Sequence, residues 1–256
     1  MSKKTLLSTA LLLLFASTVS AQSPVNITLV EDPWPPYIEG KAGAPATGGT
    51  LIKLYKKVFQ QLDGVNVNYL LMPWQRALIE VEQGKRDGIM ALFKTPERTK
   101  VMDFTVPIFT GRTMLWYSTK KFPNGLSWNK IEDLTPHHII MLRGSAMGKP
   151  LVDAKKNGVP LTITEINSHK QQFEMISLGR GDITVLTEIV GYHYLNSSKS
   201  DKHIIPMQKP LSAGDVYYMA FSKKSPARKL IPQINTVIES MQASGELNRI
   251  LRGQSH

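Results

Sequence analysis

Apolar and polar positions along the first half of the chain alternate in the order expected of strands and helices. Short apolar runs rich in β-branched residues predict strands, and longer stretches with apolar residues three or four positions apart predict helices. These elements fall, as strand and helix in turn, at residues 25–30, 51–62, 65–71, 74–83 and 88–92. A β-α-β-α-β order predicts an α/β lobe with parallel strands.

The second half of the chain repeats this alternation. Strands are predicted at residues 139–142, 161–165 and 183–186, with helices beginning near Ala146 and Lys170 between them. Two further extended segments, at residues 113–118 and 216–222, flank this set. One apolar stripe in the last helix predicts core packing, through Leu230, Ile231, Ile234, Val237, Ile238 and Met241. We therefore expect a second α/β lobe after the first.

One short motif occurs in both halves. Residues 84–89 read Gly-Lys-Arg-Asp-Gly-Ile and residues 179–184 read Gly-Arg-Gly-Asp-Ile-Thr. Each follows a predicted helix and opens a predicted strand. Glycine adopts the left-handed conformation that ends a helix, and a basic residue favours the negative end of the helix dipole. The motif predicts two similar helix-to-strand junctions, although a chance match at a common kind of junction is the alternative.

The composition removes several classes of function. Cysteine is absent, which excludes disulfides, thiolate metal sites and cysteine nucleophiles. The six histidines are scattered or adjacent, so structural roles are expected and no metal site or other cofactor is predicted. The chain lacks the Gly-x-Ser-x-Gly and phosphate-loop signatures of enzymes. Its basic residues form scattered doublets, which favours a solvated surface over nucleic-acid binding.

The first residues predict export. Lys3 and Lys4 precede an apolar run, and small residues stand at the positions that a signal peptidase reads before Gln22. Cleavage after Ala21 would lower the formal net charge from +11 to +9. The run is too short and too interrupted by hydroxyl residues to span a membrane, and Gln22 replaces the cysteine of a lipoprotein. We predict a signal peptide at residues 1–21 and a soluble periplasmic protein without a lipid anchor.

The residues after the first motif carry a resemblance. Residues 95–107 read Thr-Pro-Glu-Arg-Thr-Lys-Val-Met-Asp-Phe-Thr-Val-Pro, and Trp-Pro-Pro-Tyr stands at residues 34–37. With Gly48-Gly49, Pro73-Trp74 and Arg143-Gly144-Ser145, they closely resemble solute-binding protein family 3, the periplasmic proteins that supply polar amino acids to ABC importers.

The resemblance implies a two-lobed α/β flytrap, the periplasmic-binding-protein fold, whose flavodoxin-like lobes are joined by two crossovers. We expect the first lobe at residues 22–115 and 220–256, and the second at residues 116–219. The implied partners are a small carboxylate ligand and an ABC permease in the inner membrane, and we expect a monomer.

Arg98 is the strongest candidate for binding a carboxylate. It is predicted in a loop after the strand at residues 88–92, and the planar guanidinium fork matches a carboxylate with two parallel hydrogen bonds. A surface pair with Glu97 or Asp103 is the alternative. Across the cleft, Ser145 and Ala146 open a predicted helix whose free N–H groups suit an anion. The resemblance implies that this turn joins Arg98 at the ligand carboxylate, and Thr95 belongs to the same ligand-binding segment.

Aromatic residues are predicted beside this pair. By the resemblance, the ring of Trp34 covers the ligand, and Tyr37 belongs to the same loop. Trp74 and Arg76 begin a helix after a proline, where Trp74 would form a wall of the cleft. Core packing for the tryptophan and tyrosine, and a surface charge for Arg76, are the alternatives.

The departures from the family pattern concern the ligand's amine. Thr187, followed by Glu188, stands where amino-acid binders usually carry the aspartate that neutralises the ligand ammonium. Burying an unpaired ammonium costs several kcal/mol. Either the ligand lacks one, or Glu188 or another acid meets it. Phe93 and Lys94 replace small hydroxyl residues and predict a more apolar and cationic pocket, unless Lys94 points to solvent.

These observations predict a non-enzymatic binding protein of an ABC importer that closes over an amino acid or a related organic acid. One alternative is an exported enzyme on the same scaffold, resembling cyclohexadienyl dehydratase. Glu188 is then the candidate general acid. A periplasmic ligand sensor that docks on a receptor is a further alternative.

Overall fold

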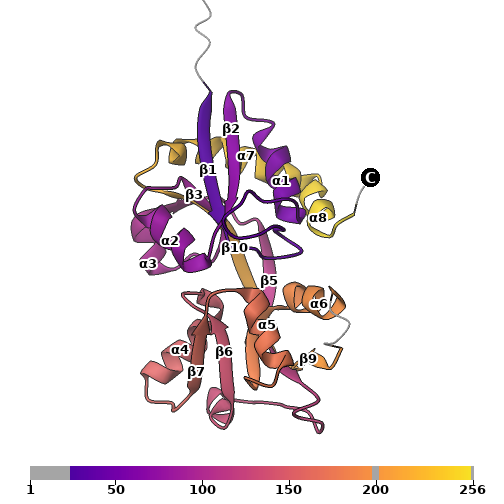
Figure 1. Cartoon of the computed structure of the whole chain (residues 1–256). Helices are drawn as coiled ribbons and strands as arrows, with labels where there is room; N and C mark the ends of the chain where they lie inside the picture. The colour runs from indigo at the N-terminus through magenta and orange to yellow at the C-terminus, as the bar shows by residue number, and fades with distance from the viewer. Residues whose placement is uncertain (1–23, 198–201, 255–256) are drawn as a thin grey trace, which may run out of the picture.

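The computed structural model describes residues 24–197 and 202–254, so the predicted signal peptide lies outside the described residues. The chain forms two α/β lobes placed end to end (Figure 1). The order of hydrogen-bonded strands is β2-β1-β3-β10-β5-β8-β6-β7, with β4 beside β10 and β9 beside β5. Within the described ranges, no helix is long and apolar enough to cross a membrane.

The first lobe is built on parallel strands, as predicted. β1 pairs in parallel with both β2 and β3, and β10 closes the sheet in the antiparallel direction. Helix α1 buries Leu51, Leu54, Tyr55 and Val58, which are spaced for one face of a helix. The elements are β1 (Val25–Glu31), α1 (Thr50–Phe59), β2 (Val65–Leu71), α2 (Trp74–Glu82), β3 (Gly88–Leu92), α3 (Pro96–Val101) and β4 (Met102–Phe104).

The second lobe repeats this plan. β6 pairs in parallel with β7 and β8, and β5 adds to β8 in the antiparallel direction. The elements are η1 (Ile131–Leu134), β6 (His138–Leu142), η2 (Ala146–Gly148), α4 (Lys149–Lys156), β7 (Thr162–Ile166), α5 (His169–Ser177), β8 (Ile183–Thr187), α6 (Glu188–Ser197) and β9 (Ile204–Pro206). β3 and β8, the strands that follow the repeated motif, are buried along their whole length.

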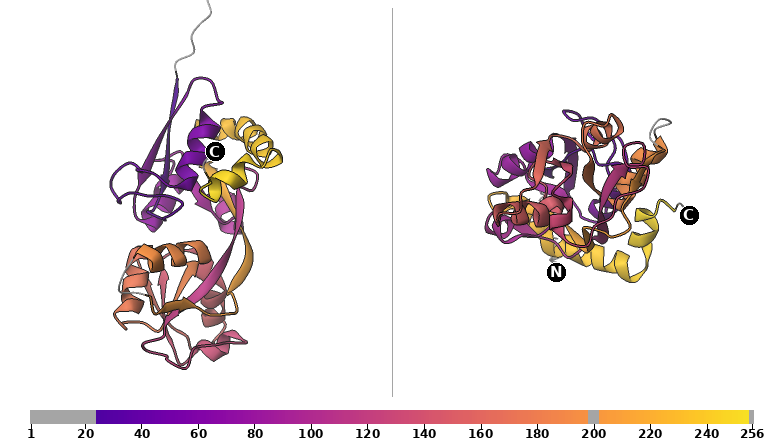
Figure 2. Two further views of the ribbon diagram at one scale, coloured as in Figure 1. Left: turned by 90° about the vertical axis from the view of Figure 1, so that its right-hand side faces the viewer. Right: turned by 90° about the horizontal axis from the view of Figure 1, so that it is seen from below.

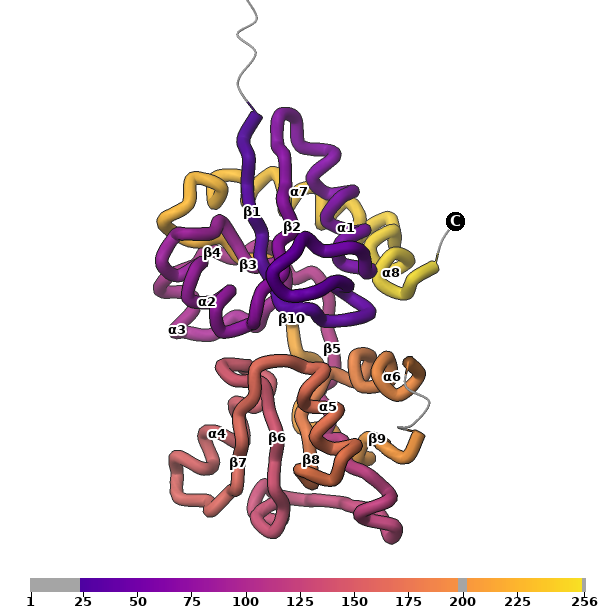
Figure 3. The backbone as a smooth tube through the Cα atoms, in the orientation of Figure 1, coloured from indigo at the N-terminus to yellow at the C-terminus, as the bar shows by residue number. Residues whose placement is uncertain are grey.

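Two paired strands connect the lobes. β5 (Phe109–Ser118) leaves the first lobe, and β10 (Ser212–Ser222) returns to it beside β5 (Figure 2). The last helices lie on the first lobe (Figure 3): η3 (Pro226–Leu230), α7 (Ile231–Ala243) and α8 (Glu246–Leu251). Of these, α7 and α8 pack against α1. The lobe boundaries after residues 115 and 219 stay a prediction.

The repeated motif forms the same junction in both lobes. Gly84 and Gly179 have positive φ angles of 77° and 69° after α2 and α5, as predicted for helix ends. The carboxylate of Asp87 then accepts a hydrogen bond of 2.7 Å from the backbone N–H of Thr28 in β1. The carboxylate of Asp182 does the same, at 2.7 Å, with the N–H of His138 in β6. Each aspartate therefore ties a motif to the neighbouring parallel strand of its own lobe.

Two local predictions are wrong. Arg98 lies in helix α3, not in a loop, because the side chain of Thr95 caps this helix and Pro96 occupies its first position. The helix predicted from Ala146 begins as the three-residue 3₁₀ turn η2, and the α-helix starts only at Lys149, where the following proline suits a first turn.

Candidate ligand-binding cleft

One cavity lies where the carboxyl ends of β1, β3 and β6 meet, between the two lobes. Its empty volume is about 340 Å³. Ligands of open α/β sheets bind outside the carboxyl ends of the strands, and this cavity has that position. The first lobe lines it with Glu31, Asp32, Trp34, Trp74, Phe93 and Arg98, and the second lobe with Leu142, Ser145, Ala146, Met147 and His169. Tyr217 of β10 completes the lining together with Ala91 and Leu92.

Arg98 reaches this cavity from α3. One guanidinium nitrogen, Nη1, donates to the carbonyl of Phe93 at 2.9 Å, and Nη2 lies 3.5 Å from the carbonyl of Gly144 in the second lobe. The guanidinium carbon lies 5.4 Å from the ring centroid of Trp74. Arg98 is only 8% exposed, and burial lowers its pKa to about 10. No acidic side chain in the described ranges forms an ion pair with it.

The turn opposite Arg98 belongs to the second lobe. Gly144 has a φ of 71°, which favours glycine. Its carbonyl accepts a hydrogen bond of 3.1 Å from the indole nitrogen of Trp74. The hydroxyl of Ser145 accepts from the N–H of Met147 at 3.3 Å and so caps the 3₁₀ turn. The structure therefore brings Trp74, Arg98 and Ser145 together, as the sequence predicts.

An aromatic cluster forms one wall. The ring centroids of Trp34 and Tyr37 are 4.6 Å apart, and those of Phe109 and Tyr217 are 4.5 Å apart. Trp34 lines the cavity, and its buried indole nitrogen has no hydrogen-bond partner in the part of the chain that is described. Tyr37 instead packs behind Trp34, which is the core-packing alternative. Phe93 lines the cavity and packs edge-on against Tyr217 at 4.8 Å.

Two adjacent acids were missed by the sequence analysis. Glu31 ends β1 and accepts hydrogen bonds from the N–H of Ala91 at 2.9 Å and of Asp32 at 3.3 Å. Both acids are buried, and burial holds the pKa of Glu31 well above its usual range. Burial also raises the pKa of Asp32 to about 7. The available signal was their place directly after a predicted strand, at the edge where ligands bind.

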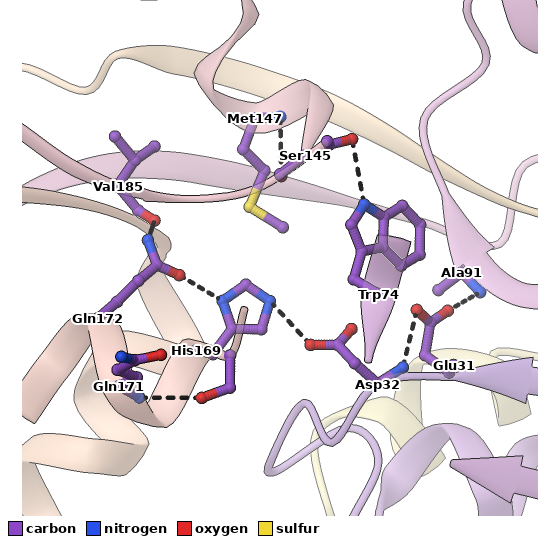
Figure 4. Close-up of polar contacts among 12 residues, drawn as sticks. Glu31, Asp32, Trp74, Ala91, Ser145, Met147, His169, Gln171, Gln172 and Val185 are labelled. Atoms are coloured by element: carbon purple, nitrogen blue, oxygen red, sulfur yellow. Dashed lines mark hydrogen bonds and ion pairs between the residues drawn. The ribbon is translucent and has the colours of Figure 1, made fainter. Parts of the chain in front are cut away.

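His169 was also missed, because the histidines were expected to be structural. It is the first residue of α5, directly beyond β7, and it is buried. Its Nε2 lies 3.7 Å from Oδ2 of Asp32, and its Nδ1 lies 2.9 Å from Oε1 of Gln172 (Figure 4). Burial lowers the pKa of His169 to about 4, so the ring is neutral at pH 7. The side chains of Asp32 and His169 thus meet across the two lobes.

Other predicted ligand-binding residues lie outside this cavity. Arg76 is on the exposed face of α2 and pairs with Glu80 at 2.6 Å. Lys94 is exposed, and its ammonium lies 5.7 Å from the ring centre of Phe104. This agrees with the alternative that Lys94 points to solvent. Thr95 lines an adjoining surface hollow beside Arg98.

The two residues expected at the ligand amine also lie elsewhere. Thr187 is 3% exposed in β8, and its hydroxyl has no hydrogen-bond partner among the described residues. Glu188 begins α6 and lies 3.5 Å from Nη1 of Arg112. Neither residue lines the cavity. The described ranges also contain no group of three acidic or histidine side chains suited to a metal ion.

Known proteins resemble this chain over nearly its whole length. A model of the family described as "Bacterial extracellular solute-binding proteins, family 3" matches residues 27–253. A search of curated protein sequences found no match.

Three solved structures share the fold. An ancestral arginine-binding protein bound to arginine is 21% identical with a TM-score of 0.76, and covers 92% of this chain and 99% of its own. The amino acid ABC transporter substrate-binding protein AbpA of Streptococcus pneumoniae, bound to L-arginine, is 20% identical with a TM-score of 0.74, over 90% and 94%. A histidine kinase sensor domain with similarity to periplasmic binding proteins is 14% identical with a TM-score of 0.75, over 90% and 95%.

Proposed function

This chain belongs to the bacterial extracellular solute-binding proteins of family 3, and we propose on that basis that it binds a small carboxylate between its two lobes. The bound acid would be an amino acid or a related organic acid. The lobes would close on it by bending at the paired strands β5 and β10, and the closed form would be presented to an ABC permease. The predicted signal peptide supports a periplasmic location.

The observation that carries this proposal is the buried guanidinium of Arg98. A buried charge is costly unless an opposite charge and hydrogen bonds compensate for it. Arg98 has two carbonyl contacts but no carboxylate partner in the described chain, and it lines the cavity. A ligand carboxylate would supply the missing charge and accept two parallel hydrogen bonds. The neighbouring hydroxyl of Ser145 lies in the same lining.

A screen of small acids tests this function. Thermal-shift measurements would cover the amino acids, their 2-oxo analogues and aromatic acids, and calorimetry would follow for each compound that raises the melting temperature. We expect at least one acid to stabilise the protein, because a ligand that binds only the folded state raises its stability. If no carboxylate shifts the melting temperature at millimolar concentration, the proposal is wrong.

An enzyme on this scaffold is the second candidate, and one observation favours it. Asp32 is a buried carboxyl in the cavity whose pKa is raised by burial to about 7, which suits a general acid. Glu188, the acid expected for this role, lies outside the cavity beside Arg112. Turnover of prephenate or arogenate that is lost in Asp32→Asn would support the enzyme. Binding of acids without turnover would support the transport protein.

The partner of the closed form separates transport from sensing. The family and AbpA support a permease, and the similarity to a kinase sensor domain supports a receptor. Genes for a permease and an ATPase beside the gene of this chain would favour transport. A neighbouring receptor kinase would favour sensing.

A further inference from the structure

The hydrogen bonds of Gln172 determine which nitrogen of His169 carries the proton. The amide nitrogen of Gln172 lies 2.9 Å from the backbone carbonyl of Val185, which can only accept. The same nitrogen donates at 3.1 Å to the hydroxyl of Thr184, whose own proton is directed to the carbonyl of Ile140 at 2.9 Å. The amide oxygen of Gln172 therefore faces Nδ1 of His169 as an acceptor, and Nδ1 must carry the hydrogen.

The neutral ring consequently presents a lone pair on Nε2 to Asp32 (Figure 4). When Asp32 is ionised its Oδ2 is also an acceptor, and it accepts no hydrogen bond from any described residue. The two atoms are 3.7 Å apart, which is beyond hydrogen-bond distance. Both residues are at least 95% buried and line the cavity. Two buried acceptors that face each other in a ligand cavity are complementary to a hydrogen-bond donor.

We propose that Oδ2 of Asp32 and Nε2 of His169 jointly bind a protonated amine of the ligand, while Arg98 binds its carboxylate. This inference rests on the proposed function and names the ligand class, a small amino acid or other amino-carboxylate. A donor about 2.9 Å from both acceptors fits between two atoms that lie 3.7 Å apart. Each acceptor would take one of the three hydrogens of an ammonium.

The surrounding charges favour an amine over a neutral hydroxyl. Glu31 uses its two oxygens for backbone N–H groups of Ala91 and Asp32, so Asp32 is the acid with a free oxygen in the cavity. Arg98 and Asp32 both line the cavity, and their side chains can carry opposite charges. A ligand with one acidic and one basic group satisfies both at once. The amine site thus replaces the anchor that Thr187 cannot provide.

The proposed amine site would also make closure of the two lobes depend on the positive charge of the ligand. Asp32 follows β1 of the first lobe, and His169 begins α5 of the second. An amine bound to both would hold the lobes together, in addition to the contact between Trp74 and Gly144. Gln172 acts as a positioning residue because it fixes the tautomer of His169 without lining the cavity.

Calorimetry with matched compounds tests the proposal. The panel contains each L-amino acid, its analogue without the 2-amino group, and its amide, which keeps the amine but lacks the carboxylate. We expect amino acids to bind wild type at least tenfold more tightly than their deaminated analogues. Asp32→Asn and His169→Phe should each reduce this preference at least tenfold, whereas the control His193→Phe, outside the cavity, should keep it.

The outcomes separate this inference from the proposed function. If deaminated acids bind as tightly as amino acids, the carboxylate function stands and the amine site is wrong. If only the amides bind, and Asp32→Asn abolishes that binding, the amine site stands and the carboxylate function is wrong. If nothing in the panel binds, both are wrong. A preference that survives in both cavity variants also overturns the amine site.

Nitrogen-15 NMR of the histidine rings tests the geometry without any ligand. We expect His169 at pH 7 to be neutral with its hydrogen on Nδ1. The signals that disappear in His169→Phe identify this ring. Gln172→Leu removes the acceptor at Nδ1 and should shift the hydrogen toward Nε2. An imidazolium, or a hydrogen on Nε2 in wild type, would overturn the proposed acceptor pair.

Discussion

The indole nitrogen of Trp74 in the first lobe donates to the carbonyl of Gly144 in the second lobe at 3.1 Å. Nη2 of Arg98 approaches the same carbonyl at 3.5 Å. The carbonyl oxygen of Gly144 therefore contacts both Trp74, which holds the two lobes together, and Arg98, the residue proposed to bind the ligand carboxylate. Gly144 has a φ of 71°, a conformation that favours glycine at this position.

Trp74→Phe should weaken closure. The ring that packs on Arg98 is retained, but the hydrogen bond between the lobes is lost, at a cost of about 1 kcal/mol. We expect roughly fivefold weaker ligand binding and a larger radius of gyration in small-angle X-ray scattering. Trp128→Phe is the control, because its indole donates at 3.2 Å to Lys209 within the second lobe. Equal effects of the two substitutions would contradict a role of Trp74 in closure.

Thr187→Asp should destabilise the protein without creating an amine site. Thr187 is buried in β8 opposite Thr113, which donates at 2.6 Å to Asp215. A second carboxylate there would be buried without a partner, at a cost of roughly 3 kcal/mol, and would lower the melting temperature by about 6 to 12 °C. Thr187→Val should be neutral, since the hydroxyl makes no hydrogen bond in the described chain. A gain in amino-acid affinity in Thr187→Asp would show that this position faces the ligand after all.

The pKa shifts of Asp32 and His169 predict an unusual cancellation in the pH dependence of stability. Burial raises the pKa of Asp32 to about 7 and lowers that of His169 to about 4. Between about pH 4 and 6.5 the folded pair carries one proton, on Asp32. The unfolded pair also carries one, on His169, because their ordinary pKa values are about 3.9 and 6.5. Equal proton numbers mean that the pair adds no slope to the free energy of unfolding in this range.

A substitution of either residue should reveal the pH dependence of stability that the other residue causes. In Asp32→Asn, only the unfolded state binds a proton on His169 between pH 6.5 and 4, so stability relative to wild type should fall as pH is lowered. In His169→Asn, only the folded state holds the proton of Asp32 between about pH 4 and 7, so relative stability should fall as pH is raised. The limiting slope is about 1.4 kcal/mol per pH unit. Urea unfolding across this range checks both signs, and parallel curves for the three proteins would refute the assigned shifts.

Much of the fold could be predicted from the sequence because its strongest signals are local. The apolar runs of β1, β2, β3, β6 and β8 are bounded by turn residues. Both copies of the repeated motif, at residues 84–89 and 179–184, form the predicted helix-to-strand junctions. Arg98 and Ser145 could be identified because they stand in a specific motif. Helix α6 was missed, since its exposed Ile189 and Tyr192 interrupt the amphipathic pattern that predicts a helix.

The polar residues of the cavity could be predicted less well, because their burial depends on the tertiary structure. Glu31, Asp32 and His169 are of residue types that usually lie at the surface, but the folded chain buries all three. Lys94, in the loop after β3, and Arg76, on helix α2, have exposed side chains. A closer reading of strand ends would have found Asp32, because the edge of a parallel sheet collects such residues.

Calorimetry on Arg98 variants tests the central claim most directly, with the acid that gives the largest thermal shift as ligand. Arg98→Ala should weaken binding by roughly 2 to 5 kcal/mol, or about 30-fold to 4,000-fold, because a buried carboxylate loses its charged partner. Arg98→Lys should restore little, since an ammonium lacks the planar fork. The control Arg180→Ala, exposed beyond α5, should bind as wild type does. If Arg98→Ala binds the acid within twofold of wild type, the carboxylate is held elsewhere and the account is wrong.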